Sequence, residues 1–145
     1  APFINAPAAQ TMNELAQLIL NLTATDADIP ANTFTFSYAG GPTGVDITPS
    51  GVLSWTPEEN QGPSTNTLFI RVTDSGSPPL SRTNQFLVTV REVNAYPLLP
   101  APLLQTIPEG TVLSLTLDGS DTDIPTGTLV YAKVSGPAAL TVSAA

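Results

Sequence analysis

Two stretches of this chain repeat each other without a gap, at a fixed offset of 95 residues. Residues 1–50 align with residues 96–145, and 16 of the 50 aligned pairs are identical. A fixed period of this kind indicates one structural unit that is used more than once. We therefore predict a complete unit over residues 1–94 and the N-terminal half of a second unit over residues 95–145.

Short segments that alternate apolar and polar side chains predict β-strands, and no segment shows a helical period. Leu53 and Trp55, for example, face the same side of one predicted strand. Prolines and glycines, such as those of Ile29-Pro30 and Gly76–Pro79, mark the turns between strands. About seven short strands in about 90 residues predict an all-β, antiparallel Greek-key β-sandwich, in tandem. The expected strands are residues 9–13, 18–23, 34–38, 45–47, 52–55, 68–72 and 86–90, followed by residues 112–117 and 129–131 of the second unit.

The second unit contains no counterpart of Trp55 or of the strands at residues 68–72 and 86–90. A half sandwich of about 50 residues cannot close a core, and it leaves open strand edges. Two interpretations remain. Either the chain continues beyond Ala145, or a neighbouring chain supplies the missing strands by strand addition.

The composition excludes several classes of function. The chain has four Lys and Arg residues and twelve Asp and Glu residues. Its net charge of −8 argues against binding to nucleic acids and to anionic membranes. No apolar run approaches the length of a membrane span, so no membrane insertion is expected. Cysteine and histidine are both absent, which excludes disulfides, thiol chemistry and a Ser-His-Asp arrangement. Paired carboxylates could serve a glycosidase, but here they lie on predicted turns without a cleft. We therefore predict that the chain is not an enzyme.

The acidic residues gather near the predicted ends of strands. Ca²⁺ takes about six to eight oxygen ligands, several of them carboxylates, so such groups are candidate calcium ligands. Asp and Asn are also common in turns because their side chains bond to nearby backbone, and this interpretation remains open. The candidate positions are Glu14, Asp26, Asp28, Asp74, Glu92 and Asn94, with Glu109, Asp121 and Asp123 repeating part of this set in the second unit.

Four motifs of the first unit occur together: Ala24-Thr25-Asp26-Ala27-Asp28, Gly51–Pro57, Arg71–Ser81 and Val90–Asn94. With them the chain resembles cadherin repeats and, more closely, the cadherin-like or immunoglobulin-like tandem repeats of large bacterial cell-surface proteins. In cadherins, calcium lies between consecutive repeats and stiffens the junction. The resemblance thus implies one site from Glu14, Glu59, Glu92, Asn94, Asp121 and Asp123, with Asp26, Asp28 and Asp74 facing a preceding repeat.

This sequence departs from the cadherin pattern at two places. The linker reads Glu92-Val93-Asn94-Ala95-Tyr96 where cadherins are more acidic, and Gln61 replaces a carboxylate. We therefore expect one or two weakly bound calcium ions and not a full cluster of three.

The function predicted from the sequence is that of a non-catalytic structural or adhesive spacer, stiffened by calcium, in an extracellular or cell-surface protein. Its partners would be neighbouring repeats or identical chains, or a cell-surface protein or glycan. One alternative is a subunit of an extracellular filament, completed by a strand from a neighbouring chain. The other is a carbohydrate-binding module, for which Tyr38, Tyr96 and Tyr131 are the candidate aromatic platform.

Overall fold

The computed structural model describes residues 1–28 and 32–143, and the turn predicted at Ile29-Pro30 lies outside these residues. The chain divides into two compact units, Ala1–Val93 and Asn94–Ala145. Each unit is described by itself below.

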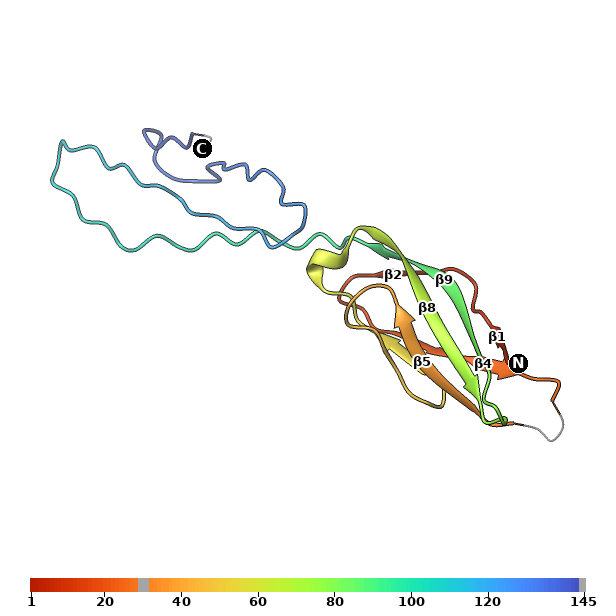
Figure 1. The fold of residues 1–145 in the computed structure, drawn as a ribbon. Coiled ribbons are helices and arrows are strands. Elements are labelled where there is room, and N and C mark those ends of the chain that lie inside the picture. Colours follow the sequence, from red (N-terminus) through yellow and green to blue (C-terminus); the bar gives the residue numbers. More distant parts are fainter. Residues whose placement is uncertain (29–31, 144–145) are drawn as a thin grey trace. The chain divides into compact units, whose positions relative to one another are not determined.

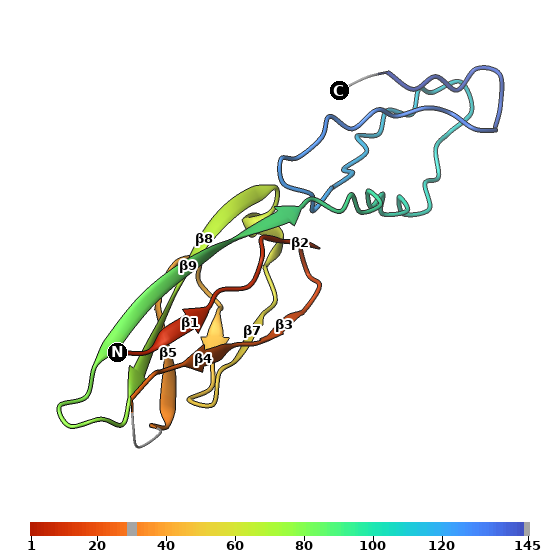
Figure 2. The same cartoon turned by 90° about the vertical axis from the view of Figure 1, so that its right-hand side faces the viewer.

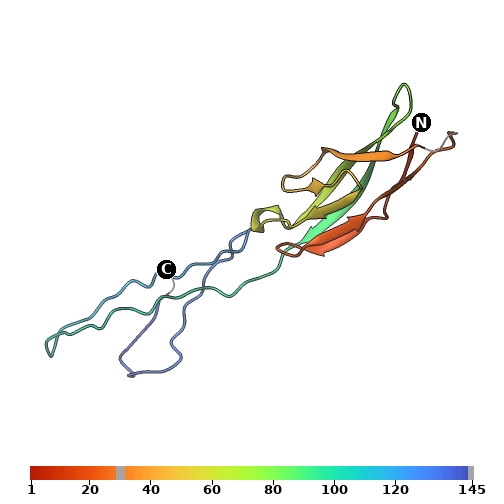
Figure 3. The same cartoon turned by 90° about the horizontal axis from the view of Figure 1, so that it is seen from below.

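The first unit is a two-layered β-sandwich, which confirms the predicted fold class (Figures 1 and 3). One layer is a four-stranded sheet in the order β2-β9-β8-β5. The other layer contains a three-stranded sheet in the order β3-β7-β6 and the two-stranded pair β1-β4. The first layer comprises β2 (Gln10–Asn13), β9 (Ser81–Arg91), β8 (Ser64–Asp74) and β5 (Phe34–Gly40), and the second comprises β3 (Leu18–Asn21), β7 (Val52–Trp55), β6 (Asp46–Ile47), β1 (Phe3–Asn5) and β4 (Thr23–Thr25).

One pairing in the sandwich differs from the antiparallel pattern. β2 runs parallel to β9, with Gln10 opposite Val88 and Asn13 opposite Arg91. The remaining ladders of the first unit's described residues are antiparallel, as expected. The parallel pairing places the C-terminal ends of β2 and β9 at the same end of the sandwich.

The core lies between the two layers, and eleven buried hydrophobic side chains of the described residues, prolines aside, form it. Long strands supply them by alternation, because successive side chains of a strand point to opposite faces. In β8 the buried apolar residues are Leu68, Ile70 and Val72, whereas Phe69 is 37% exposed. The remaining buried apolar residues are Ile4, Leu22, Phe36, Leu53, Trp55, Phe86, Val88 and Val90.

β1 lies beside both β4 and β9, at the edge where the two layers meet (Figure 2). The Asn84 side chain donates a hydrogen bond to the Ile4 carbonyl oxygen at 3.3 Å. The Arg82 guanidinium lies 5.3 Å from the centre of the Phe3 ring, a cation–π contact. These contacts hold the first strand against the sandwich.

The second unit contains no strand among its described residues, so the strands predicted at residues 112–117 and 129–131 are wrong. Its one isolated bridge joins Leu98 and Ser120. At the repeat offset this bridge corresponds to the Phe3–Thr25 pair of β1 and β4 in the first unit. The other ladders of the first unit all use a strand from residue 52 onward, and residues 94–143 contain no counterpart of these strands. The bridge within residues 94–143 thus repeats the β1–β4 pairing of the first unit.

Candidate metal centre

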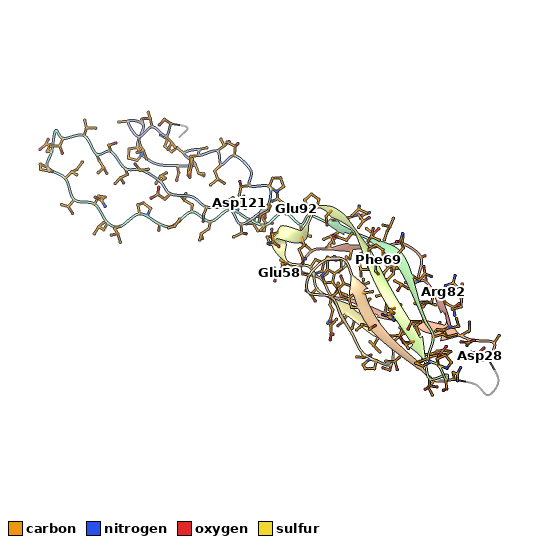
Figure 4. The ribbon with its side chains drawn as sticks, in the orientation of Figure 1. Asp28, Glu58, Phe69, Arg82, Glu92 and Asp121 are labelled. Carbon is orange, nitrogen blue, oxygen red and sulfur yellow. The ribbon has the colours of Figure 1, made fainter. Side chains whose placement is uncertain are left out.

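Acidic side chains gather at both ends of the first unit (Figure 4). Glu14, Glu59 and Glu92 form one group at one end, which we call the glutamate cluster. Asp26, Asp28 and Asp74 form the aspartate cluster at the other end. In each cluster the three residues offer carboxylate oxygens that lie within 4.8 Å of one another. The structure thus brings together two groups of predicted ligands.

The parallel pairing of β2 and β9 builds the glutamate cluster. Glu14 follows the last residue of β2, and Glu92 follows the last residue of β9. Because Asn13 lies opposite Arg91, the two glutamates leave neighbouring strands at the same level. The Glu14 amide donates to the Arg91 carbonyl at 3.0 Å, which extends the pairing into the site.

Glu59 reaches the cluster from the loop that follows β7. It opens a short 3-10 helix, η1 (Glu59–Gln61). The Leu15 amide donates to the Pro57 carbonyl at 2.8 Å and thereby ties this loop to the residue after Glu14. Three segments distant in sequence therefore place their carboxylates side by side.

Glu14 is the most informative member of the cluster, because it is only 2% exposed. Its Oε1 accepts a hydrogen bond from the Val93 amide at 2.9 Å. Its Oε2 is buried and has no hydrogen-bond partner among residues 1–28 and 32–143. Burying a carboxylate oxygen without a compensating partner is costly, and neighbouring carboxylates raise that cost by repulsion. A cation at this position would lower both costs.

Gly62 makes room for the buried carboxylate. A Cβ atom at this position would overlap Glu14 Oε2 and would lie 3.5 Å from the Arg91 carbonyl oxygen. The sequence marks Gly62-Pro63 as a turn but gives no sign that the glycine serves the cluster. This requirement follows only from the close approach of Glu14.

The side-chain amide of Gln61 is bonded to residues outside the glutamate cluster. Its Oε1 accepts a hydrogen bond from the Glu58 amide at 2.9 Å. Its Nε2 donates to the carbonyl oxygen and to the hydroxyl oxygen of Thr43, both at 3.2 Å. Both ends of the side-chain amide are therefore occupied by other partners.

The aspartate cluster is bonded more extensively to its own turns. Asp74 Oδ1 accepts the amides of Gly76 at 3.0 Å and Leu80 at 2.9 Å. Asp26 Oδ1 accepts the Asp28 amide at 3.2 Å. The Ala1 ammonium lies 3.5 Å from Asp26 Oδ2. The turn-stabilising interpretation thus applies to Asp74 and Asp26, in addition to any role as ligands.

The remaining predicted ligands belong to the second unit. Asp123 accepts the Ala95 amide at 2.8 and 3.1 Å through its two oxygens. Asp121 Oδ1 accepts the Asp123 amide at 3.2 Å, and the Asn94 side chain donates to the Ala95 carbonyl at 2.8 Å. That these residues join the glutamate cluster in one junction site stays a prediction.

Two of the three tyrosines of the predicted sugar platform are engaged by backbone. The Tyr38 hydroxyl donates to the Pro42 carbonyl at 2.7 Å, and burial raises the pKa of this phenol. The Tyr131 hydroxyl accepts the Gly119 amide at 2.9 Å. Tyr96 is 98% exposed. The two engaged rings are half-buried, and the sugar platform stays a prediction.

No helix in residues 1–28 and 32–143 is long and apolar enough to cross a membrane. No curated protein matches this chain.

Solved structures that match include ectodomain repeats of cadherins. Human CDH23 EC21-23 has a TM-score of 0.56 and 18% identity, over 88% of this chain and 45% of that one. Protocadherin Gamma B2 extracellular cadherin domains 3-6 have a TM-score of 0.55 and 20% identity, over 88% and 36%. Mouse Cadherin-23 EC22-24 has a TM-score of 0.54 and 24% identity, over 88% and 44%. This chain thus spans less than half the length of each, and the likeness shows a shared fold.

The sequence itself matches a family model, described as "Putative Ig domain", over residues 1–91. This match covers more than half of the chain and coincides with the sandwich formed by Ala1–Val93. The chain therefore belongs to the "Putative Ig domain" family, and it has the fold of cadherin ectodomain repeats.

Proposed function

We propose that this chain is a non-catalytic repeat module of an extracellular or cell-surface protein, and that its glutamate cluster binds calcium. The membership in an Ig-domain family and the cadherin-like fold support the role of a structural or adhesive repeat. The single observation that carries the calcium proposal is Glu14 Oε2, a buried carboxylate oxygen without a hydrogen-bond partner beside two further carboxylates.

The chemistry of the cluster favours a hard cation. All three residues offer carboxylate oxygen, and the chain has no histidine or cysteine to select a softer metal. Ca²⁺ tolerates irregular geometry and takes about six to eight oxygens, whereas Mg²⁺ demands a regular octahedron. Three carboxylates leave several positions for water, carbonyl oxygens or ligands such as Asn94, Asp121 and Asp123. Affinity should therefore be modest in the first unit alone.

Calcium would act by removing repulsion at the end of β9. Without a cation, three carboxylates within 4.8 Å of one another oppose the pairing of β2 with β9. A bound ion would neutralise them and fix Glu92, two residues before the linker residue Asn94. The passage from one repeat to the next would then be stiffer with calcium than without it.

Calcium titration by calorimetry, together with thermal unfolding in calcium and in chelator, tests this proposal. At a free calcium concentration of ~100 Kd, binding to the folded state alone adds ~2.7 kcal/mol of stability. Glu14→Gln keeps the shape of the side chain but removes its charge, and it should weaken calcium at least about tenfold, or ~1.4 kcal/mol.

Glu109→Gln is the matched control, because Glu109 occupies the same repeat position as Glu14 but is exposed. It should leave calcium affinity unchanged. If the wild-type chain gives no binding heat and unfolds at one temperature with and without calcium, the calcium proposal fails.

The second unit favours a second candidate, a subunit completed by strands of a neighbouring chain. A cavity of ≈ 240 Å³ in this unit is lined mainly by apolar residues, including Leu99, Leu117 and Leu129. Leu99 is 52% exposed, although its repeat counterpart Ile4 is 2% exposed. Strand addition usually takes place where exposed apolar surface lies next to backbone groups that are not paired in a sheet. Sedimentation over a range of concentrations should then show self-association, and a monomer at all concentrations would contradict it.

A further inference from the structure

We infer that Gln61 is a positioning residue for calcium, because its side-chain amide clamps η1 and thereby holds Glu59 in the glutamate cluster. This inference rests on the proposed calcium site. In the cadherin pattern, the carboxylate at this position is a metal ligand. Here Gln61 replaces that carboxylate, and the inference assigns it a different role.

The hydrogen bonds of Gln61 fix the orientation of its amide. The Glu58 amide can only donate, so it requires the Gln61 oxygen, at 2.9 Å. The Thr43 carbonyl can only accept, so it requires the Gln61 nitrogen, at 3.2 Å. One side chain thus joins the start of η1 to a loop that precedes it by 18 residues. A carboxylate at position 61 could satisfy the first bond but not the second.

The clamp continues into the core through one shared acceptor. The Trp55 indole nitrogen donates to the same Thr43 carbonyl oxygen, at 3.1 Å. Trp55 is 1% exposed and is the one tryptophan of the chain. The loop that receives Gln61 is therefore itself held by a fully buried side chain, so the clamp is anchored to the core of the sandwich.

Glu59 needs such a clamp because the turn that carries it is short. η1 has three residues, so it makes few backbone bonds of its own. Repulsion from Glu14 and Glu92 would drive Glu59 outward in the metal-free protein. The Ser64 hydroxyl donates to the Gln61 carbonyl at 2.5 Å at the end of the turn. At its start, the bond from the Glu58 amide to the Gln61 side chain adds to the bond from the Gln61 amide to the Glu58 carbonyl, at 2.9 Å. Gln61 therefore preorganises Glu59 before the ion arrives.

The test compares calcium titrations of the wild-type chain, Gln61→Ala and Gln61→Glu. Losing a residue that orients a ligand costs about 10–100-fold in metal affinity, and this loss is expected for Gln61→Ala. Gln61→Glu should also weaken calcium, because a carboxylate cannot donate to Thr43. Tighter calcium binding in Gln61→Glu would show that position 61 is a ligand and would overturn the inference.

Gln85→Ala is the control, because Gln85 is an exposed glutamine on β9, outside the cluster. It should bind calcium as the wild type does. A milder variant, Thr43→Ala, removes the hydroxyl acceptor and keeps the carbonyl, so it should fall between the wild type and Gln61→Ala. Thr43→Ala also tests the clamp if Gln61→Ala does not fold.

Hydrogen exchange in chelator separates this inference from the proposed function. If the wild type binds calcium and Gln61→Ala binds it equally well, the clamp is wrong and the calcium site stands. If the wild type binds no calcium, the site is wrong, and metal-free exchange of the Glu58 and Gln61 amides still decides on the clamp. If these amides exchange at least about tenfold faster in Gln61→Ala than in the wild type, the clamp is supported. If their exchange is unchanged, the clamp is wrong.

Discussion

The two units of this chain share a sequence pattern but differ in burial. Ile4 and Leu99 occupy the same repeat position, yet Ile4 is 2% exposed and Leu99 is 52% exposed. Strands β7, β8 and β9 supply eight of the eleven buried core side chains of the first unit, and residues 94–143 contain no counterpart of these strands. The difference shows that the repeated residues, which lie in both layers of the first unit, need the strands after residue 51 to bury their apolar side chains.

Local contacts, in contrast, are the same in both units. The Asp28 amide donates to Asp26, and the Asp123 amide donates to Asp121, both at 3.2 Å. Tyr38 and Lys133 occupy one repeat position, and each donates to the carbonyl of the proline four residues later, at 2.7 and 3.0 Å. A contact within a few residues needs no distant partner, so it forms whether or not a core closes.

The largest expected effect comes from lengthening the second unit by counterparts of β7, β8 and β9. A chain lengthened after Ala145 by a copy of residues 51–93 continues the repeat in register. The second unit should then unfold in a cooperative transition of its own, with a stability of about 5 kcal/mol or more. Differential scanning calorimetry would detect it. A lengthened chain that still unfolds in one transition, with the same heat, would mean that the second copy cannot form a sandwich.

The second-largest difference between the two units is expected when apolar side chains at one repeat position are truncated. Ile4→Ala removes a buried side chain and should lower the free energy of unfolding by about 2–5 kcal/mol. Leu99→Ala removes a half-exposed side chain and should change it by less than ~0.5 kcal/mol. Urea unfolding followed by Trp55 fluorescence measures the effect in the first unit, and hydrogen exchange of the amides of residues 94–143 measures it in the second. Equal effects of the two substitutions would show that Ile4 and Leu99 do not differ in burial.

Adding a methyl group to a glycine should lower stability where the surrounding atoms are close, and should have little effect where the space is open. Gly62→Ala forces Glu14 out of its place, so we expect about 1–3 kcal/mol of destabilisation and weaker calcium binding. Gly127, in the second unit, has open space where its Cβ would lie. Gly127→Ala should therefore be tolerated within ~0.5 kcal/mol. Calorimetric titration and urea unfolding check the pair, and a harmless Gly62→Ala would refute the close approach of Glu14.

The smallest effect concerns the hydrogen bond that both units make. Tyr38→Phe removes the bond to Pro42 and should cost about 0.5–1.5 kcal/mol near neutral pH. Because burial raises the pKa of Tyr38, its contribution is complete below the phenol pKa of the unfolded chain, about 10, and is lost as pH rises through the folded value.

Unfolding at pH 8 and pH 11 measures this dependence. Tyr38→Phe should lose less stability than the wild type between these values. Lys133→Met, at the same repeat position on an exposed segment, should have no measurable effect on stability. A wild-type chain and a Tyr38→Phe chain with parallel pH profiles would contradict the prediction.

Much of the fold could be predicted from the sequence, and less of the candidate site. Alternation along residues 68–72 and 86–90 identified β8 and β9, because the pattern of buried and exposed side chains is local. Alternation does not reveal which strands pair, so the parallel pairing of β2 with β9 was not foreseen. That pairing is what brings Glu14 next to Glu92. The sequence also offered no sign that Gln61 turns toward Thr43, since 18 residues separate the two.

By itself, the sequence determined most strands of the first unit, though not β1 and β4, together with the faces that they bury and the presence of acidic groups near their ends. It did so because periodicity and turn residues act over a few positions. Only the tertiary structure decided which carboxylates meet, which of them is buried without a partner, and which copy of the repeat has a core. Those outcomes depend on contacts between residues far apart in the chain, and the second unit, with the same local pattern and no such contacts, remains open.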